Sequence, residues 1–319
     1  MKTYTYALMA MLVFLLVTTG CGCNQQGPES INLFAQKDST PPKLLSSKAT
    51  DTATITLKFS EELRSNSLTL QVNGVKNTNY LCKRETVTLY LTSPMDVASS
   101  TRVEGRVEDL WGNSTRFSLD VWAHNPNRAD LLINEFSTKG SASNPDRVEL
   151  YITKAGNLGG ITVTNGVGAL AKDRCILGDK QVFAGDFIVI AFQEGGADTG
   201  YNSESLAGLS SNNGCITVTE SPNWESPILD AVLYSNKTTT TFGGFGSRET
   251  EQEVLLLYQG RQWDSPLAER AIDSTNSTAT RTLCRDTYSD TNSEQDWYVC
   301  DTKGASFGGV NSSIQFDSN

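Results

Sequence analysis

The sequence predicts an all-β protein: two β-sandwich domains in tandem, the second carrying one or two short inserted helices. Three observations predict this architecture. Apolar and polar residues alternate over many short segments, which is typical of strands that bury one face. Asn, Gly and Ser separate these segments, as they do in turns. The chain of 319 residues, less a 20-residue signal, suits two domains better than one.

Residues 1–20 have the features of an export signal. Lys2 precedes an apolar run of eleven residues, 7–17, about half the length that a helix needs to span a bilayer. The following Thr18-Thr19-Gly20-Cys21 resembles the lipobox of bacterial lipoproteins, in the loose form found in spirochaetes, since Thr18 replaces the usual leucine. The resemblance implies cleavage before Cys21 and a diacylglycerol on its thiol. The alternative is a simple secretory signal that leaves Cys21 unmodified.

The chain that follows is acidic. Without residues 1–20 it carries 25 basic and 36 acidic side chains, a net charge of −11. This charge argues against nucleic acid as a partner, because phosphate binding needs a concentrated positive surface. Residues 21–40 are predicted to be a polar, lipidated tether that holds the domains off a membrane.

Five cysteines lie beyond Cys21 and Cys23. An exported protein can oxidise its thiols. Cys284 and Cys300 flank one polar loop, and a disulfide between them would stabilise the fold by about 3 kcal/mol. Free buried thiols are the alternative, because five cysteines cannot all pair within one chain.

Residues 41–124 are predicted to form the first sandwich. Residues 54–59 show the alternation clearly, as do residues 68–72, 87–91 and 117–121. The stretches "ITLKFSEEL" and "VEGRVEDLWGN" resemble the bacterial Ig-like modules of surface and envelope proteins. That resemblance implies an Ig-like sandwich.

Residues 125–130 are predicted to be a linker, 131–312 a second domain and 313–319 a C-terminal tail. The apolar segment "FIVIAF", 187–192, is expected to be a central strand covered on both faces. Residues 247–260 predict a helix, with Ser247 as N-cap and Gly260 at the C-terminal end. Residues 265–273, "SPLAERAID", predict a second short helix.

The second domain resembles the lamin-tail domain, a small Ig-like β-sandwich found in many exported bacterial proteins. The resemblance covers most of residues 131–312. Its motifs are Ile-Asn-Glu at 133–135, Glu-Leu-Tyr at 149–151 and a Leu-Gly-Gly turn at 158–160. It implies an Ig-like fold with no fixed activity, because this domain occurs in proteins of unrelated function.

Glu135 and Glu149 raise the question of catalysis, because paired carboxylates can act as acid and base. They can equally lie on the polar face of paired strands. Val148, Leu150 and Ile152 share one face of a strand, so Glu149 shares the other with Arg147. We therefore expect both glutamates on a solvated face, in a structural role, with cross-strand partners such as Arg147.

Few other residues suggest chemistry. His124 is the only histidine, which argues against a catalytic triad, and no C-x-x-C or H-x-x-x-H pattern predicts a metal site. Asp286, Asp290 and Asp296 are candidate calcium ligands, but a solvated polar hairpin loop is the favoured interpretation, because Tyr288 interrupts the pattern. Trp224, between two prolines, is a candidate binding hot spot if its loop is exposed.

The sequence therefore predicts a non-enzymatic, lipid-anchored protein of the bacterial cell envelope that binds or scaffolds. The expected partners are the membrane, through Cys21, and a protein or glycan ligand. No cofactor is expected beyond the covalent lipid. A glycan-acting hydrolase that uses paired carboxylates and a purely structural spacer are the alternatives.

Overall fold

The computed structural model describes residues 38–195, 200–223, 225–288 and 290–317. Within these residues most of the regular structure is β, with a single α-helix. The prediction of an all-β sandwich protein is confirmed. Among the described residues no helix is both long and apolar enough to cross a membrane.

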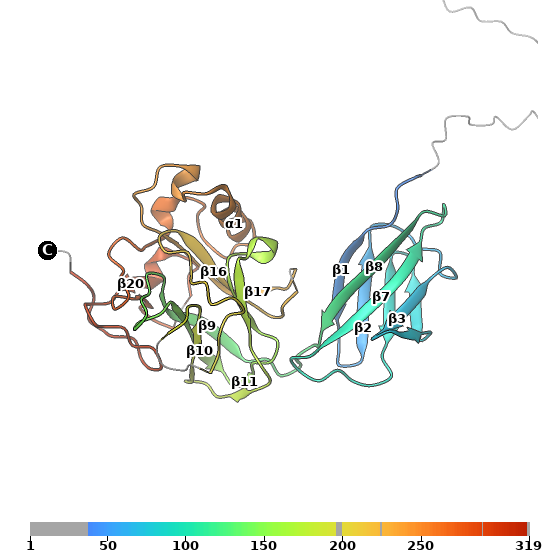
Figure 1. The fold of residues 1–319 in the computed structure, drawn as a ribbon, viewed down its shortest axis with the longest axis horizontal. Helices are drawn as coiled ribbons and strands as arrows, with labels where there is room; N and C mark the ends of the chain where they lie inside the picture. The colour runs from blue at the N-terminus through green and yellow to red at the C-terminus, as the bar shows by residue number, and fades with distance from the viewer. Residues whose placement is uncertain (1–37, 196–199, 224, 289, 318–319) are drawn as a thin grey trace, which may run out of the picture. The chain divides into compact units, whose positions relative to one another are not determined.

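The first sandwich consists of two four-stranded antiparallel sheets, with strand orders β1-β2-β6-β5 and β4-β3-β7-β8 (Figure 1). The alternation has the expected effect, since Ile55, Leu57 and Phe59 are buried while Lys58 is exposed. Apolar residues of both sheets form one core. The strands are β1 (Leu44–Ala49), β2 (Thr54–Phe59), β3 (Thr69–Val72), β4 (Val75–Asn77), β5 (Tyr80–Lys83), β6 (Thr86–Tyr90), β7 (Ser100–Glu108) and β8 (Ser114–Trp122).

Two short turns shape this sandwich. Strands β3 and β4 are joined by Asn73 and Gly74, both with positive φ (49° and 77°), as a two-residue type I′ hairpin requires. The turn before β8 is held by Asp109, whose Oδ1 accepts from the backbone N–H groups of Trp111 and Asn113, both at 2.8 Å. The Asp-Leu-Trp-Gly-Asn motif therefore acts through one buried carboxylate.

The second sandwich packs the sheet β15-β10-β9-β19-β20 against the sheet β13-β12-β16-β17-β18, with a small β11–β14 pair beside them. Between the named strands, all pairings are antiparallel except that of β17 with β18. The strands are β9 (Asp130–Ser137), β10 (Arg147–Lys154), β11 (Gly156–Asn157), β12 (Thr162–Asn165), β13 (Asp173–Ile176), β14 (Gln181–Val182), β15 (Phe187–Ala191), β16 (Gly214–Thr219), β17 (Ile228–Ser235), β18 (Ile272–Asp273), β19 (Leu283–Arg285) and β20 (Trp297–Val299).

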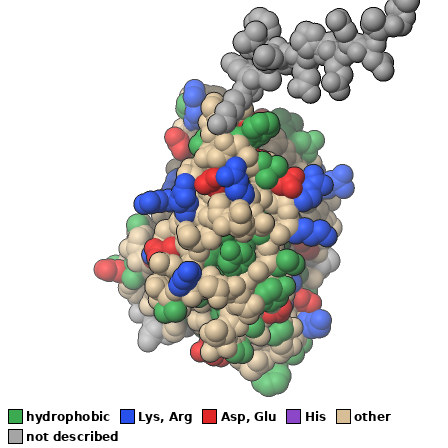
Figure 2. All heavy atoms as spheres, turned by 90° about the vertical axis from the view of Figure 1, so that its right-hand side faces the viewer, with side chains coloured by type: hydrophobic (Ala, Val, Ile, Leu, Met, Phe, Trp, Pro, Cys, Tyr) green, Lys and Arg blue, Asp and Glu red, His purple; other side chains and the backbone are tan. Residues whose placement is uncertain are grey.

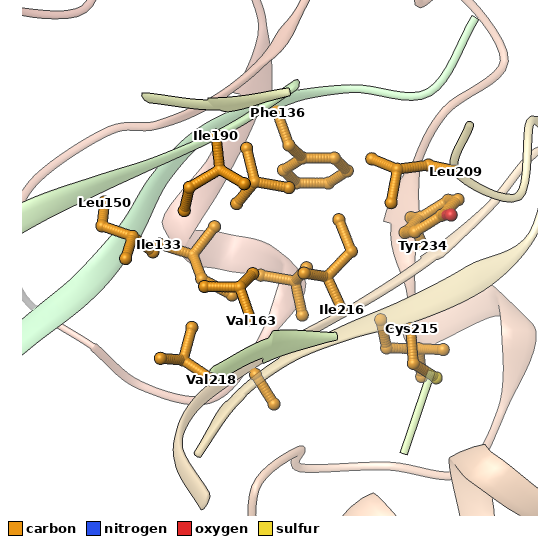
Figure 3. Packing of buried hydrophobic residues seen from close by; sticks show 14 of the residues in the cluster. Ile133, Phe136, Leu150, Val163, Ile190, Leu209, Cys215, Ile216, Val218 and Tyr234 are labelled. Carbon is orange, nitrogen blue, oxygen red and sulfur yellow. The ribbon is translucent and has the colours of Figure 1, made fainter. Parts of the chain in front are cut away.

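The core between these sheets is aliphatic with aromatic residues at one end. Figure 3 shows Ile133 and Leu150 of one sheet facing Val163 and Val218 of the other. Phe136 lies beside Tyr234, with ring centroids 5.5 Å apart.

Strand β15 corrects one expectation. "FIVIAF" lies at the edge of its sheet, paired only with β10 among the named strands. Ile188 and Ile190 point into the core, whereas Phe187 and Val189 are half-buried on the other face. Phe187 packs against Tyr151 there, with ring centroids 5.3 Å apart. The apolar run therefore reflects cover from side chains of its own sheet and not a central position.

One of the two expected helices is present. Helix α1 (Arg248–Gln259) begins after Ser247, whose Oγ accepts from the N–H of Thr250 at 3.1 Å. The segment after Ser265 forms only a 3-10 turn, η3 (Ala268–Arg270). Its helix ends there because Ala271 and Ile272 are buried in the core and Ile272 pairs with β17. The other 3-10 turns are η1 (Gly168–Leu170), η2 (Phe242–Gly244) and η4 (Glu294–Asp296).

Candidate functional site: a buried carboxylate pair under a C-terminal strap

Glu135 and Glu149 lie directly opposite each other on β9 and β10. The register shifts beside them, because Glu149 pairs with Glu135 but Leu150 pairs with Ile133. Asn134 is therefore the extra residue of a β-bulge. The bulge lets Ile133 and Phe136 both enter the core while Asn134 and Glu135 share the opposite face with Glu149.

Both glutamates are fully buried, with 0 % of each residue exposed, so the expectation of a solvated face is wrong. A segment far along the chain covers that face. Residues 304–311, here called the strap, lie over the sheet and donate hydrogen bonds to both carboxylates. Alternation along a strand identifies two faces, but it does not tell whether another segment covers the outer one.

The donors to each carboxylate come from strand and strap together. Glu135 accepts from the hydroxyl of Thr282 and, at 3.0 Å and 2.8 Å, from the N–H and Oγ of Ser306. Glu149 accepts from Asn134 Nδ2 at 2.8 Å and from the N–H of Gly308. Every carboxylate oxygen of the pair therefore has a donor from the protein.

Two further contacts hold the strap. Asn311 Nδ2 donates to the carbonyls of Asn134 and Arg285, at 3.1 Å and 2.9 Å. Phe307 lies under the guanidinium of Arg147, 5.0 Å from its ring centroid. Arg147 thus stacks on the strap, and its charge opposes the rise in the pKa of Glu135.

Burial dominates the electrostatics of the pair. It raises the pKa of Glu135, although the hydrogen bonds from Thr282 and Ser306 work against it. It raises the pKa of Glu149 to about 7, with the donors Gly308 and Asn134 opposing and the charge of Glu135 adding to the rise. A carboxyl with a pKa near neutrality can change its protonation state at physiological pH, although the side chain of Glu149 is buried beneath the strap.

Two cysteines complete the cluster. Cys284 pairs with Glu135 across β19 and β9, and Cys300 Sγ accepts from the N–H of Thr282 at 3.1 Å. The hydroxyl of Thr282, which donates to Glu135, also lies 3.1 Å from Cys300 Sγ. The interaction between the two thiols lowers the pKa of Cys300 and raises that of Cys284. Both are free and buried in this structure. The disulfide between Cys284 and Cys300 stays a prediction. The two residues lie close enough together that the hydroxyl of Thr282 contacts both sulfur atoms.

The calcium candidates occupy a different environment. Arg285 is only 1 % exposed at its side chain and contacts Asp290 at 3.2 Å and Asp296 at 3.8 Å. Asp296 also accepts from the N–H and hydroxyl of Thr291, both at 2.8 Å. Asp286 makes no ion pair among the described residues. A guanidinium thus stands where the calcium interpretation places the cation, which favours the polar-loop interpretation.

The buried ion-pair partner of Arg285 is Asp230, a residue that the sequence analysis did not single out. It is 0 % exposed, pairs with Arg285 Nη2 at 3.0 Å and accepts from the N–H of Ile133 at 2.5 Å. Burial raises its pKa to about 7, and the charge of Arg285 opposes the rise. An aspartate inside the apolar segment "ILDAVLY" was the available signal, because a charge buried there needs a partner.

The remaining predicted residues lie outside the described part of the chain. Cys21, the expected lipid attachment site, precedes residue 38. Trp224, the candidate hot spot, falls in the one-residue gap between 223 and 225.

Comparison with known families returns one finding. A family model described as "protein second domain" matches residues 129–207 and 203–299, which together cover more than half of the chain. The matched span contains both glutamates and Asp230 and ends before Cys300 and the strap. A search of curated proteins finds no match.

Proposed function

The chain belongs to the family described as "protein second domain" through residues 129–299, and from this premise we propose a lipid-anchored, non-enzymatic envelope lipoprotein that binds or scaffolds through tandem sandwiches. In this proposal the first sandwich is a bacterial Ig-like module and the second is lamin-tail-like. The motifs at 133–135 and 149–151 support the second assignment. The membrane is one partner, and a protein or glycan of the envelope is the other.

The burial of Glu135 and Glu149 supports the proposal that the protein is not an enzyme. A catalytic acid or base must reach the proton that it transfers. Glu135 and Glu149 are 0 % exposed, and strap and strand donors occupy their oxygens. His124, the only histidine in the sequence, follows β8 and is not among the residues that donate to either glutamate. In this proposal the two carboxylates have a structural role: they accept hydrogen bonds from the strap and hold it on the sheet.

The lipid anchor has its own test. Cells fed an alkyne-tagged fatty acid should label the protein, and the Cys21→Ala variant should lose the label. Cys23→Ala, two residues away, is the matched control. This variant should keep the fatty-acid label and remain in the membrane fraction. Equal labelling of the Cys21→Ala variant, or none in the unmodified chain, would overturn the anchor. Protease digestion of intact cells, against lysed cells, would then show which face of the envelope carries the protein.

The binding role is tested on isolated envelope. The full chain should co-sediment with envelope fragments saturably and release no reducing sugar ends from them. Glu149→Gln should bind equally well. Reducing ends that disappear with Glu149→Gln would establish a hydrolase instead. If the protein shows no saturable binding to envelope, the remaining interpretation is that it is a purely structural spacer.

A further inference from the structure

A groove lies on the first sandwich between the β3–β4 hairpin and the loop that follows β6. Its volume is about 580 Å³, within the range of about 300–1,000 Å³ that is usual for small-ligand sites. We call it the β4 groove. It is lined by residues between Val72 and Asn79, by the segment from Leu91 to Asp96 and by residues 99–101.

The groove offers uncharged hydrogen-bonding groups that the protein does not use. Thr78, Asn79, Thr92 and Ser93 are exposed, and among the described residues their side chains make no hydrogen bond. Such groups can donate and accept without the cost of breaking bonds inside the protein. Four free amide or hydroxyl side chains around one groove are suited to a ligand with many hydroxyls.

The wall that carries these groups is held in place. Asn73 Oδ1 accepts from the N–H of Arg102 at 3.0 Å, which ties the hairpin turn to β7. Asn77 Oδ1 accepts from the N–H of Asn79 at 2.7 Å, and Asn77 Nδ2 donates to the carbonyl of Tyr90 at 3.3 Å. A preorganised wall reduces the entropy lost when a ligand binds.

Apolar surface accompanies the polar groups. Val75 is 70 % exposed at the rim, and Met95 is buried beneath the groove.

The charged residues that line the groove are Lys76 and Asp96, one of each sign. The whole sandwich is similarly balanced, with ten basic and nine acidic side chains in residues 39–124. The face drawn in Figure 2 likewise shows hydrophobic and uncharged surface between scattered charges of both signs.

We propose that the β4 groove binds a neutral glycan segment. The inference rests on the proposed function, to which it adds the ligand class and the site. Sugar hydroxyls would pair with the free amides and hydroxyls, and the C–H faces of the rings would pack on Val75 and Pro94. A charged ligand finds no excess of opposite charge here. A peptide added as a strand would have only the three residues of β4, where Lys76 protects the edge.

The test uses the full-length Cys21→Ala chain, neutral tetrasaccharides of glucose and of N-acetylglucosamine, and isothermal titration calorimetry. At least one tetrasaccharide should bind, and Asn79→Ala combined with Thr92→Ala should weaken it about tenfold, as expected for two lost hydrogen bonds. The matched control is Asn66→Ala with Thr69→Ala, both exposed on the same sandwich outside the groove, and it should bind as the parent does. Thermal unfolding confirms that all three proteins are folded.

The outcomes separate this inference from the proposed function. If no tetrasaccharide binds, or if the groove variant binds as the control does, the inference is overturned even though envelope co-sedimentation persists. If the groove variant loses envelope binding, and protease treatment of the envelope abolishes binding of the parent, the ligand is a protein and the glycan class is overturned. If no variant and no parent co-sediments with envelope, the proposed function itself fails.

Discussion

Replacing Glu149 by glutamine should change how the stability of the protein depends on pH. Burial raises the pKa of Glu149 from 4.5 to about 7 in the folded state. The folded protein therefore holds this proton more tightly than the unfolded chain does, and the stabilisation is complete below pH 4.5 and is lost as the pH rises to 7. With about 1.4 kcal/mol for each pKa unit, the loss reaches about 3 kcal/mol.

Glutamine has nearly the same shape and does not ionise, so the variant lacks this loss. The isoelectric point near 4.7 makes pH 5.5 and pH 8 better measuring points than more acidic ones. Between them, the free energy of unfolding of Glu149→Gln relative to the parent should rise by about 2 kcal/mol. Asp230 and Glu253, whose pKa values burial also raises to about 7, are common to both proteins and cancel in the difference.

Urea unfolding followed by tryptophan fluorescence measures this difference, because Trp297 packs on Phe136 in the core of the second sandwich, 5.3 Å between ring centroids. Glu225→Gln is the control, since Glu225 is exposed on a loop. Parallel pH profiles for Glu149→Gln and the parent would refute the reasoning. A carbon-13 titration in which the Glu149 carboxyl ionises below pH 5 would refute it directly.

Three further predictions concern the same sandwich. Arg285→Leu should lower the free energy of unfolding by about 3–5 kcal/mol, because it leaves the Asp230 carboxylate buried without its cation; a loss below about 1 kcal/mol in urea unfolding would contradict the pairing. Mild oxidation should join Cys284 to Cys300, seen by mass spectrometry as a loss of two hydrogens in one linked peptide pair, and a linkage to another cysteine would argue against their adjacency. Ser247→Ala should cost about 1 kcal/mol in thermal or urea unfolding by removing the N-cap of α1, with no change at all as the contrary result.

Much of the fold could be predicted because strand alternation is a local property. A strand such as 54–59 buries every second side chain wherever its partner strands come from. Ser247 likewise caps α1 through a residue three positions away. The expected second helix failed for the opposite reason, since residues 271–273 are drawn into the core and onto β17, a contact more than 30 residues distant.

The sequence by itself determined the all-β class, the main strands and the capped helix, because each depends on residues close together in the chain. Only the tertiary structure decided the environment of Glu135 and Glu149. Their donors Ser306 and Gly308 lie more than 150 residues away, and the bulge at Asn134 turns Glu135 toward the covered face. Whether a carboxylate on a strand is solvated or buried depends on which distant segment packs over it, and strand alternation does not report such non-local contacts.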